Sequence, residues 1–144
     1  MPRYGRFQRE GRKGFAKDAT ANEAVGRAIL DAAFKIHSSL GPGLLEGAYE
    51  LCLAYEIGRL GLSAQRQVLV PIQYDALRID NGYRIDLIVD DAVIVGLKAI
   101  ETISTAHRAQ LLSYLRLGGF RLGYLMNFNV ARMRDGIFRL VNDL

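Results

Sequence analysis

The chain has 144 residues, of which half are hydrophobic and 24% are charged. This length and balance are typical of one soluble domain with a single core, and no apolar run approaches the ~20 residues that a membrane span requires. The only cysteine, Cys52, excludes an intramolecular disulfide and indicates a cytoplasmic protein.

Positive charge is concentrated at the N-terminus. Residues 1–18 contain six Lys/Arg and two acidic residues, whereas the rest of the chain contains 13 of each sign. We therefore predict a basic, flexible tail over residues 1–18, followed by a single domain over residues 19–144. Such a tail can contact phosphates, although a solubilising leader is the simpler interpretation.

Two helices are predicted first. Apolar residues recur at helical spacing over residues 22–39, with Asn22 as the N-cap, and "LGPG" at residues 40–43 ends this helix. The second helix covers "LLEGAYELCLAYEIGRLG", residues 44–61. It stops at Gly61, because glycine is favoured just past a helix end.

Five strands and a third helix follow. The runs at residues 67–74, 83–89 and 92–100 are rich in β-branched and aromatic residues, and Pro71 indicates that the first strand lies at an edge or carries a bulge. Ser104 can cap a helix over residues 105–117, and residues 121–128 and 136–141 form the last two strands. This order predicts an α+β fold with helices packed on a mainly antiparallel sheet.

The apolar pattern also sets the register of the second and third strands. With a three-residue loop at residues 90–92, apolar residues pair directly, 89 with 93, 87 with 95 and 85 with 97, whereas a two-residue loop matches them poorly. On the other face, this register sets Asp86 opposite Gly96 and Arg84 opposite Lys98. We expect the Cα atoms of Asp86 and Gly96 to lie about 4.5–5.5 Å apart, with Lys98 in the same polar patch.

An Asp on one strand beside x-x-Lys on its hairpin partner resembles the arrangement in PD-(D/E)XK nucleases. The resemblance implies a restriction-endonuclease-like core in which an Asp and a Glu or Asp bind a divalent metal, while the Lys lies near the attacking water. Hard carboxylate oxygens suit Mg²⁺ (or Mn²⁺), which activates water and neutralises phosphate charge. A lysine there can orient the nucleophile or stabilise developing negative charge.

Within that superfamily, the chain is similar to the GxxExxY proteins over about residues 22–141. "GLLEGAY" at 43–49 matches the naming motif, "GYRIDLIVDDAVIVGLKAIE" at 82–101 resembles the strand pair, and "HRAQLLSYLRLGGFRLGYLMNF" at 107–128 resembles the following helix and strand. The chain departs from the family at one position, where Gly96 replaces the Glu of Glu-Leu-Lys. The resemblance therefore implies a missing metal-binding carboxylate, which natural decay, adaptation to binding without cleavage or an engineered change would each explain.

The resemblance implies that Asp86 binds the metal and that Lys98 acts at the water or the phosphate. The simpler alternative for Asp86 is a salt bridge to Arg84 or Lys98. Glu46 is expected to face the site as a second carboxylate that holds metal through water. Its alternative is a first-turn acid that the helix dipole favours. Tyr49, on the same helix face, is expected to be a structural support.

His107, Gln110 and Tyr114 fall at i, i+3 and i+7, on one helical face. The Gln-x-x-x-Tyr spacing is similar to a motif of RecB-type nucleases, in which these residues line the active site. Gln110 is the best candidate, because an amide can both accept and donate hydrogen bonds, and His107 and Tyr114 are supporting candidates. Glu101 could replace the missing carboxylate, although it lies five residues beyond position 96.

The sequence thus predicts an Mg-dependent nuclease-fold protein that acts on nucleic acid phosphodiesters and is catalytically impaired by Gly96. Whether it is an active hydrolase, and whether DNA or RNA is the substrate, stays open. Two other classes remain. One is a nucleic-acid-binding module that does not cleave, and the other is a homo-oligomeric interaction or structural protein with a vestigial site. No membrane partner is expected.

Overall fold

The computed structural model describes residues 19–142, so the predicted basic tail at residues 1–18 lies outside the described residues. The described helices and strands follow one another in this order: α2 (Ala19–Leu40), α3 (Glu46–Arg59), β1 (Ala64–Tyr74), β2 (Leu77–Val89), β3 (Val93–Lys98), α4 (Thr105–Gly118), β4 (Leu122–Asn127), the 3₁₀ helix η1 (Met133–Gly136) and β5 (Ile137–Val141). None of the helices in residues 19–142 combines the length and the hydropathy of a bilayer-spanning helix.

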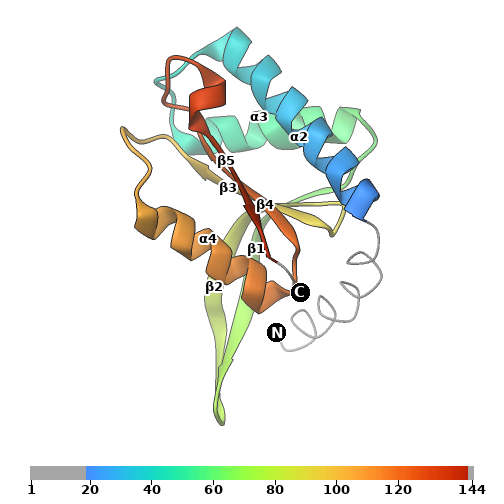
Figure 1. Ribbon diagram of the computed structural model, residues 1–144, viewed down its shortest axis with the longest axis vertical. Helices are drawn as coiled ribbons and strands as arrows, with labels where there is room; N and C mark the ends of the chain where they lie inside the picture. The colour runs from blue at the N-terminus through green and yellow to red at the C-terminus, as the bar shows by residue number, and fades with distance from the viewer. Residues whose placement is uncertain (1–18, 143–144) are drawn as a thin grey trace.

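The sheet contains the five strands in sequence order, β1-β2-β3-β4-β5. Neighbouring strands are antiparallel except for β3 and β4, which are parallel and are connected through α4. Parallel strands need such a crossover, because a tight turn cannot join them. Figure 1 shows α2 and α3 packed on one face of the sheet and α4 on the other. The predicted α+β fold is confirmed.

Two apolar clusters fill the space between the sheet and its helices. Val93 and Val95 of β3 join the cluster under α2 and α3, whereas Ile94 joins the cluster under α4. This division follows from strand geometry, because successive side chains point to opposite faces. Gly96 belongs to the face of Ile94, since a Cβ atom built on it would contact Leu111 of α4. The α4 face therefore carries the polar patch predicted from the sequence.

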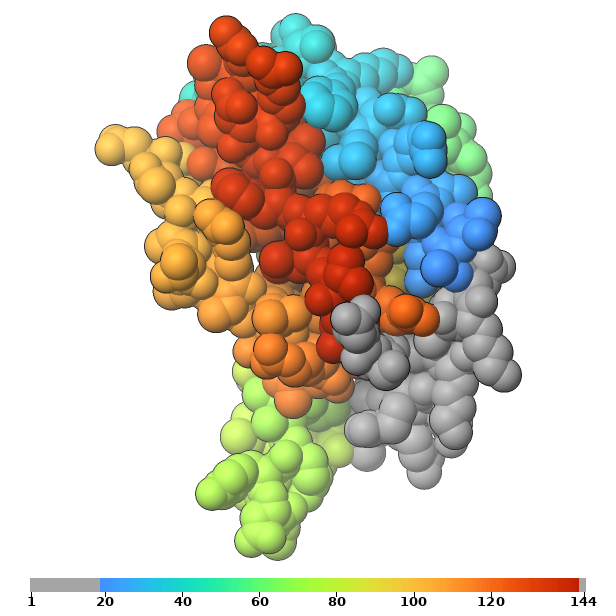
Figure 2. All heavy atoms as spheres, viewed as in Figure 1, coloured from blue at the N-terminus to red at the C-terminus, as the bar shows by residue number. Residues whose placement is uncertain are grey.

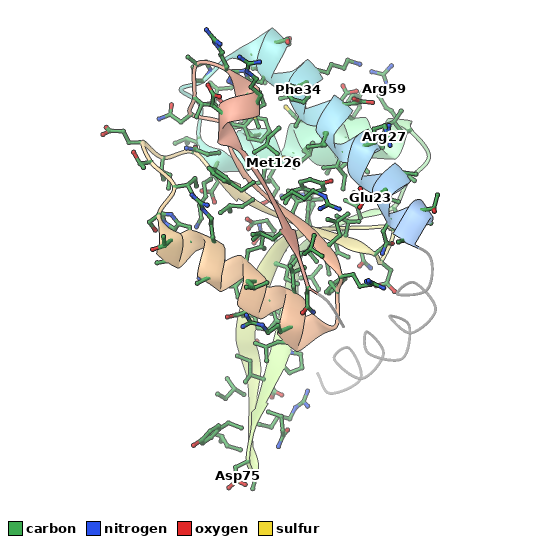
Figure 3. The ribbon with its side chains drawn as sticks, viewed as in Figure 1. Glu23, Arg27, Phe34, Arg59, Asp75 and Met126 are labelled. Carbon is green, nitrogen blue, oxygen red and sulfur yellow. The ribbon has the colours of Figure 1, made fainter. Side chains whose placement is uncertain are left out.

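The hairpin of β1 and β2 extends beyond the helical layers, with Asp75 at its tip (Figures 1 and 3). In the space-filling view it is the green projection below the rest of the domain (Figure 2). Pro71 lies where the β1–β2 register shifts, between Val70 and Ile72, and β1 is an edge strand. Both predictions for Pro71 are confirmed, because a residue without an N–H is tolerated at such positions.

The loop at residues 90–92 has the predicted length, and Asp90 and Asp91 both have positive φ, which Asp tolerates better than most residues. The register is confirmed for residues 89 with 93 and 87 with 95. The third expected pair, 85 with 97, is absent from the β2–β3 ladder. Instead, the Leu97 N–H donates to the carboxylate of Asp86 at 2.7 Å. The Asp86 side chain therefore accepts this hydrogen bond in place of a backbone carbonyl of the facing strand.

Three sequence predictions about element starts are wrong. The first strand was predicted to start at Gln67, but β1 starts at Ala64. Asn22 is not an N-cap, because α2 already includes Ala19, and Asn22 lies buried inside the helix. The second strand was predicted to start at Tyr83, but β2 starts at Leu77. Residues 77–82 are rich in turn-forming types, yet they pair with β1 as the outer part of the hairpin.

Candidate active site

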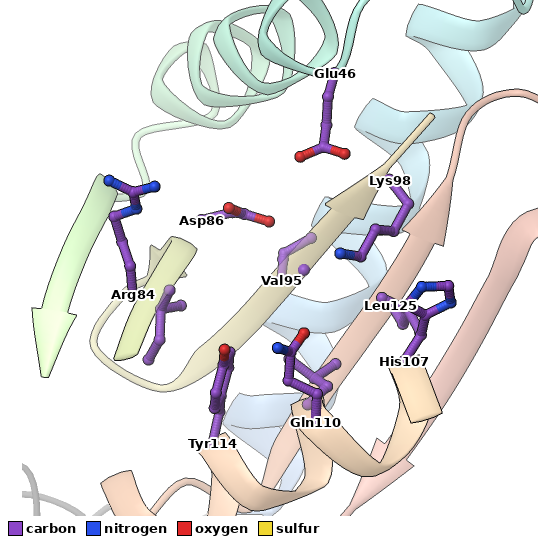
Figure 4. Close-up of a pocket in the computed structure, with 12 residues that line it drawn as sticks. Glu46, Arg84, Asp86, Val95, Lys98, His107, Gln110, Tyr114 and Leu125 are labelled. Atoms are coloured by element: carbon purple, nitrogen blue, oxygen red, sulfur yellow. The ribbon is translucent and has the colours of Figure 1, made fainter. Parts of the chain in front are cut away.

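A cavity of about 260 Å³ opens on the α4 face of the sheet, beside β2 and β3. Figure 4 shows polar side chains that converge on it from α3, β2, β3 and α4. The polar residues that line it are Glu46, Arg84, Asp86, Lys98, His107, Gln110 and Tyr114. Gly96 and four apolar residues complete the wall. All four residues predicted as catalytic from the sequence thus lie around one cavity.

Asp86 occupies the centre of this wall, on β2. Its neighbours on β1, Arg66 and Val68, pair with β2, whereas the residue between them, Gln67, has φ +53° and leaves the ladder. Backbone in the left-handed region is uncommon for a non-glycine residue, and such strain is frequent at functional sites. On the β3 side, the Asp86 carboxylate accepts the backbone N–H of Leu97 and also borders the cavity.

Glu46 reaches the cavity from the first turn of α3, on the opposite side of the sheet from α4 (Figure 4). Partial desolvation raises the pKa of this carboxyl above its ordinary value, and the negative charge of Asp86 raises it further. Lys98 and the backbone N–H of Ala99 act in the other direction by stabilising the charged form. The two carboxylates therefore share one electrostatic environment, as two ligands of one cation would.

Tyr49 does not line the cavity but fixes the segment that leads into α3. It is fully buried and stacks on Phe128 with ring centroids 4.5 Å apart. Its hydroxyl donates to the Gly41 carbonyl at 2.6 Å and accepts from the Leu44 N–H at 3.1 Å. These bonds determine where α3 begins and hence where Glu46 is placed. Tyr49 thus has the contacts of a structural support.

Lys98 ends β3, and its side chain points toward the cavity between Glu46 and α4 (Figure 4). Its backbone is paired with β4, and its carbonyl accepts the Phe128 N–H at 3.0 Å. The next turn is held by Asn127, which is buried and bonds both the N–H and the carbonyl of Ile100. Lys98 therefore lies at a strand end whose backbone is held by several hydrogen bonds.

The three predicted residues of α4 all face the cavity. His107 also forms a capping box with Ser104, in which its Nδ1 accepts the Ser104 N–H at 2.9 Å. In the neutral ring the proton is therefore on Nε2. Burial, and then the charge of Asp86, raise the pKa of Tyr114, so its hydroxyl stays protonated and can donate a hydrogen bond.

The sequence comparison agrees with this geometry. Residues 23–140 match the sequence model of the PD-(D/E)XK nuclease superfamily. The chain belongs to the PD-(D/E)XK nuclease superfamily. Searches of curated proteins and of solved structures found no match.

PD-(D/E)XK nucleases hold a divalent metal through acidic side chains, and the residues of this cavity provide a minimal donor set for one. Glu46 and Asp86 both border the cavity, while one oxygen of Asp86 already accepts the Leu97 N–H. Within residues 19–142, no group of three or more His, Cys, Asp or Glu side chains is placed to hold a metal ion. Mg²⁺ commonly binds one or two carboxylates together with waters and substrate phosphates, so the two carboxylates match the number that such a site uses.

Gly96 is the position at which the sequence analysis expected an acidic side chain in this domain. It lines the cavity together with Asp86, and both residues lie just beyond the last β2–β3 ladder pair, Leu87 with Val95. A Cβ atom there would contact Leu111 and Leu125 at 3.4 Å, which is an ordinary van der Waals distance. The site therefore has room for a side chain that the sequence does not supply.

Two further residues complete the comparison between sequence and site. Glu101 is exposed and does not line the cavity, so the structure does not bring it together with Asp86. Arg84 lines the cavity, although the sequence argument treated it only as a salt-bridge partner of Asp86. The signal that could have found it is the two-residue spacing, which puts residues 84 and 86 on the same face of a strand.

Proposed function

We propose that this protein is a metal-dependent nuclease-fold protein of the GxxExxY type that acts on phosphodiesters of nucleic acids, with activity weakened by Gly96. The observation that carries the proposal is the convergence of Glu46, Asp86 and Lys98, from three different elements, on one cavity. Phosphodiester hydrolysis needs this combination of acidic ligands and a cation beside them.

Glu46 and Asp86 are the residues that would hold the cation, for which Mg²⁺ or Mn²⁺ is the expected identity. A divalent ion bound there would lower the pKa of a water molecule and neutralise charge on the phosphate. Lys98 contributes a positive charge close to both acids and favours the extra negative charge of the transition state.

The residues of α4 complete the proposed site. Gln110 can donate its amide N–H to a phosphate oxygen and accept from the attacking water. The hydroxyl of Tyr114 remains a donor, because burial and Asp86 keep its pKa raised. The two side chains lie on the α4 side of the cavity (Figure 4), so they can orient a phosphate that enters between α4 and the strands.

A second candidate is a module that binds nucleic acid without cleaving it. Two observations favour it. Gly96 contributes no ligand, and one oxygen of Asp86 is already engaged by the backbone of Leu97. Such a module keeps the cationic groups of the cavity and loses the positional control of the metal that phosphoryl chemistry requires.

The deciding experiment is a cleavage assay on single- and double-stranded DNA and RNA with and without Mg²⁺, for the natural chain and for Asp86→Asn. Asp86→Asn keeps the shape of the side chain and removes its charge. An active nuclease shows Mg²⁺-dependent cleavage that this variant loses. Salt-sensitive binding without cleavage supports the second candidate. Neither binding nor cleavage of any of the four substrates would refute both.

A further inference from the structure

Arg84 is the cavity residue without a role in the site described so far. It lies on β2 two residues before Asp86, so both side chains leave the same face of the strand. Figure 4 shows its guanidinium on the side of Asp86 that is opposite to Lys98. The cavity therefore has a cationic side chain on each flank of its central carboxylate.

The other arginines of this hairpin are occupied. Arg66 forms an ion pair with the buried Glu50 at 3.0 Å, and Arg78 forms one with Asp80 at 2.7 Å. By contrast, Arg84 has neither an ion pair nor a side-chain hydrogen bond with any residue of the described part of the chain, and it is exposed. An arginine that borders a polar cavity with all its donors available is suited to bind an anion from solution.

The arrangement of charges limits which anion fits. A guanidinium presents a planar fork of N–H donors that matches a phosphate in two parallel hydrogen bonds. If Lys98 contacts the phosphate that reacts, Arg84 lies on the other side of Asp86 from that contact (Figure 4). A second phosphate on the same strand can occupy that position, so that each cation is paired with a phosphate of its own.

We propose that Arg84 binds the phosphate next to the reacting one, so that this site selects a polynucleotide strand with consecutive phosphates over ligands with a single phosphodiester. The inference rests on the proposed function and goes beyond it by assigning a substrate-binding residue and a minimal substrate. Arg84 acts in binding and alignment, and the reacting atoms are contacted by other side chains.

The first test measures binding without metal, so that cleavage does not interfere. Fluorescein-labelled oligothymidylate, alone and in a duplex with oligoadenylate, is titrated in EDTA at several salt concentrations. Arg84→Ala should weaken binding about 10- to 100-fold, as loss of a charged hydrogen-bonding partner predicts. It should also reduce the slope of log affinity against log salt by about one. Arg84→Lys keeps the charge and loses the planar fork of donors. Its affinity for the labelled strand should therefore lie between those of the natural chain and Arg84→Ala.

The matched control is Arg59→Ala. Arg59 has an exposed side chain at the last turn of α3, about 20 Å along the helix from Glu46. Its weak surface ion pair contributes little to stability, so the variant should fold and bind as the natural chain does. Thermal unfolding of Arg84→Ala, Arg84→Lys and Arg59→Ala checks that all three remain folded.

The second test distinguishes the number of phosphates. Thymidylyl-thymidine, with one phosphodiester, and its 5′-phosphorylated form, with two phosphates, compete with the labelled strand. The natural chain should bind the second competitor more tightly, and Arg84→Ala should lose this preference while its affinity for the first competitor is unchanged. The role of Arg84 would be overturned, with the proposed function left standing, by either of two results. One is an equal salt slope for the natural chain and Arg84→Ala, and the other is an Arg84→Ala variant that still prefers the competitor with two phosphates. Absence of nucleic acid binding by the natural chain would overturn the proposed function and this inference together.

Discussion

Introducing a carboxylate at position 96 is the perturbation that tests the site most directly. In Gly96→Glu the new Cβ atom would contact Leu111 and Leu125 at 3.4 Å, so the backbone need not move. Gly96 does not adopt positive φ, and therefore a non-glycine residue is not strained there. The new carboxylate would extend into the cavity from β3, beside Asp86 on β2.

The magnitude of the effect follows from two opposing contributions. Replacing glycine within a strand gains about 0.5–1 kcal/mol from the unfolded chain. Two carboxylates roughly 5 Å apart across a hairpin repel by about 1–3 kcal/mol at an effective dielectric constant of 20–80. The metal-free variant should therefore be less stable than the natural chain, by up to about 2 kcal/mol. A divalent cation held between the acids reverses this repulsion.

The assay is thermal unfolding as a function of Mg²⁺, with Gly96→Gln as a control of the same size without charge. If the third carboxylate tightens Mg²⁺ binding tenfold, saturating Mg²⁺ adds about 1.4 kcal/mol of stability beyond that of the natural chain. For a chain of this size, that is an extra rise in Tm of about 3–6 °C. Cleavage in Mg²⁺ should rise in parallel. An identical Mg²⁺ response in Gly96→Glu and Gly96→Gln would show that position 96 is not a ligand position.

Three further predictions concern the framework around the site. Tyr49→Phe leaves two backbone groups of the loop before α3 without their hydrogen-bond partner and should lower the free energy of unfolding by about 1–3 kcal/mol. The control is Tyr55→Phe at an exposed tyrosine, which should leave the free energy of urea unfolding unchanged. Glu50→Ala removes the buried carboxylate that accepts from Arg66 and Gln67 and should cost about 1–3 kcal/mol in urea unfolding. Lys35→Ala, at an exposed pair, should cost about 0–1 kcal/mol, and equal costs would contradict the importance of burial. Asn127→Ala should cost about 1–3 kcal/mol in the same assay and speed hydrogen exchange of the Ile100 amide, and unchanged exchange would refute its role as a clamp.

Most of the fold could be predicted because its signals are local. Helical spacing of apolar residues, the capping residue Ser104 and the alternation along residues 83–100 each give a helix or strand without reference to distant residues. The outer half of the hairpin could not be predicted in this way. Gly82 is a turn former by type, yet a side chain there would collide with Ile72 of the facing strand, so a close approach of two strands explains it. Only the tertiary structure contains that information.

Asn22 shows a second limit. By type it suits a helix start, but the helix extends beyond it, and burial overrides the capping preference.

The geometry of the candidate site was partly predictable, because some of its residues are related by regular spacing within one element or across one hairpin. Period-2 and helical spacing group Asp86 with position 96 and Gln110 with Tyr114, whereas no spacing argument brings Glu46 over the sheet. That contact depends on Tyr49 and the loop it holds.

The structure also indicates how far the fold depends on the side chains at positions 86 and 96. The stabilising clusters lie between the helices and the two faces of the sheet, where Val95 and Leu97 bury their side chains under α2 and α3. Position 96 lies between them and faces the cavity on the α4 side, beside Leu111 and Leu125 of the second cluster. Both clusters are formed without a side chain at this position. Removal of the neighbouring Asp86 is different, because its carboxylate also takes the place of a ladder carbonyl for Leu97. The fold thus depends on the Asp86 carboxylate, so we expect Asp86→Ala to lower stability as well as binding. At position 96, by contrast, we expect only an acidic side chain to lower stability, through its repulsion with Asp86.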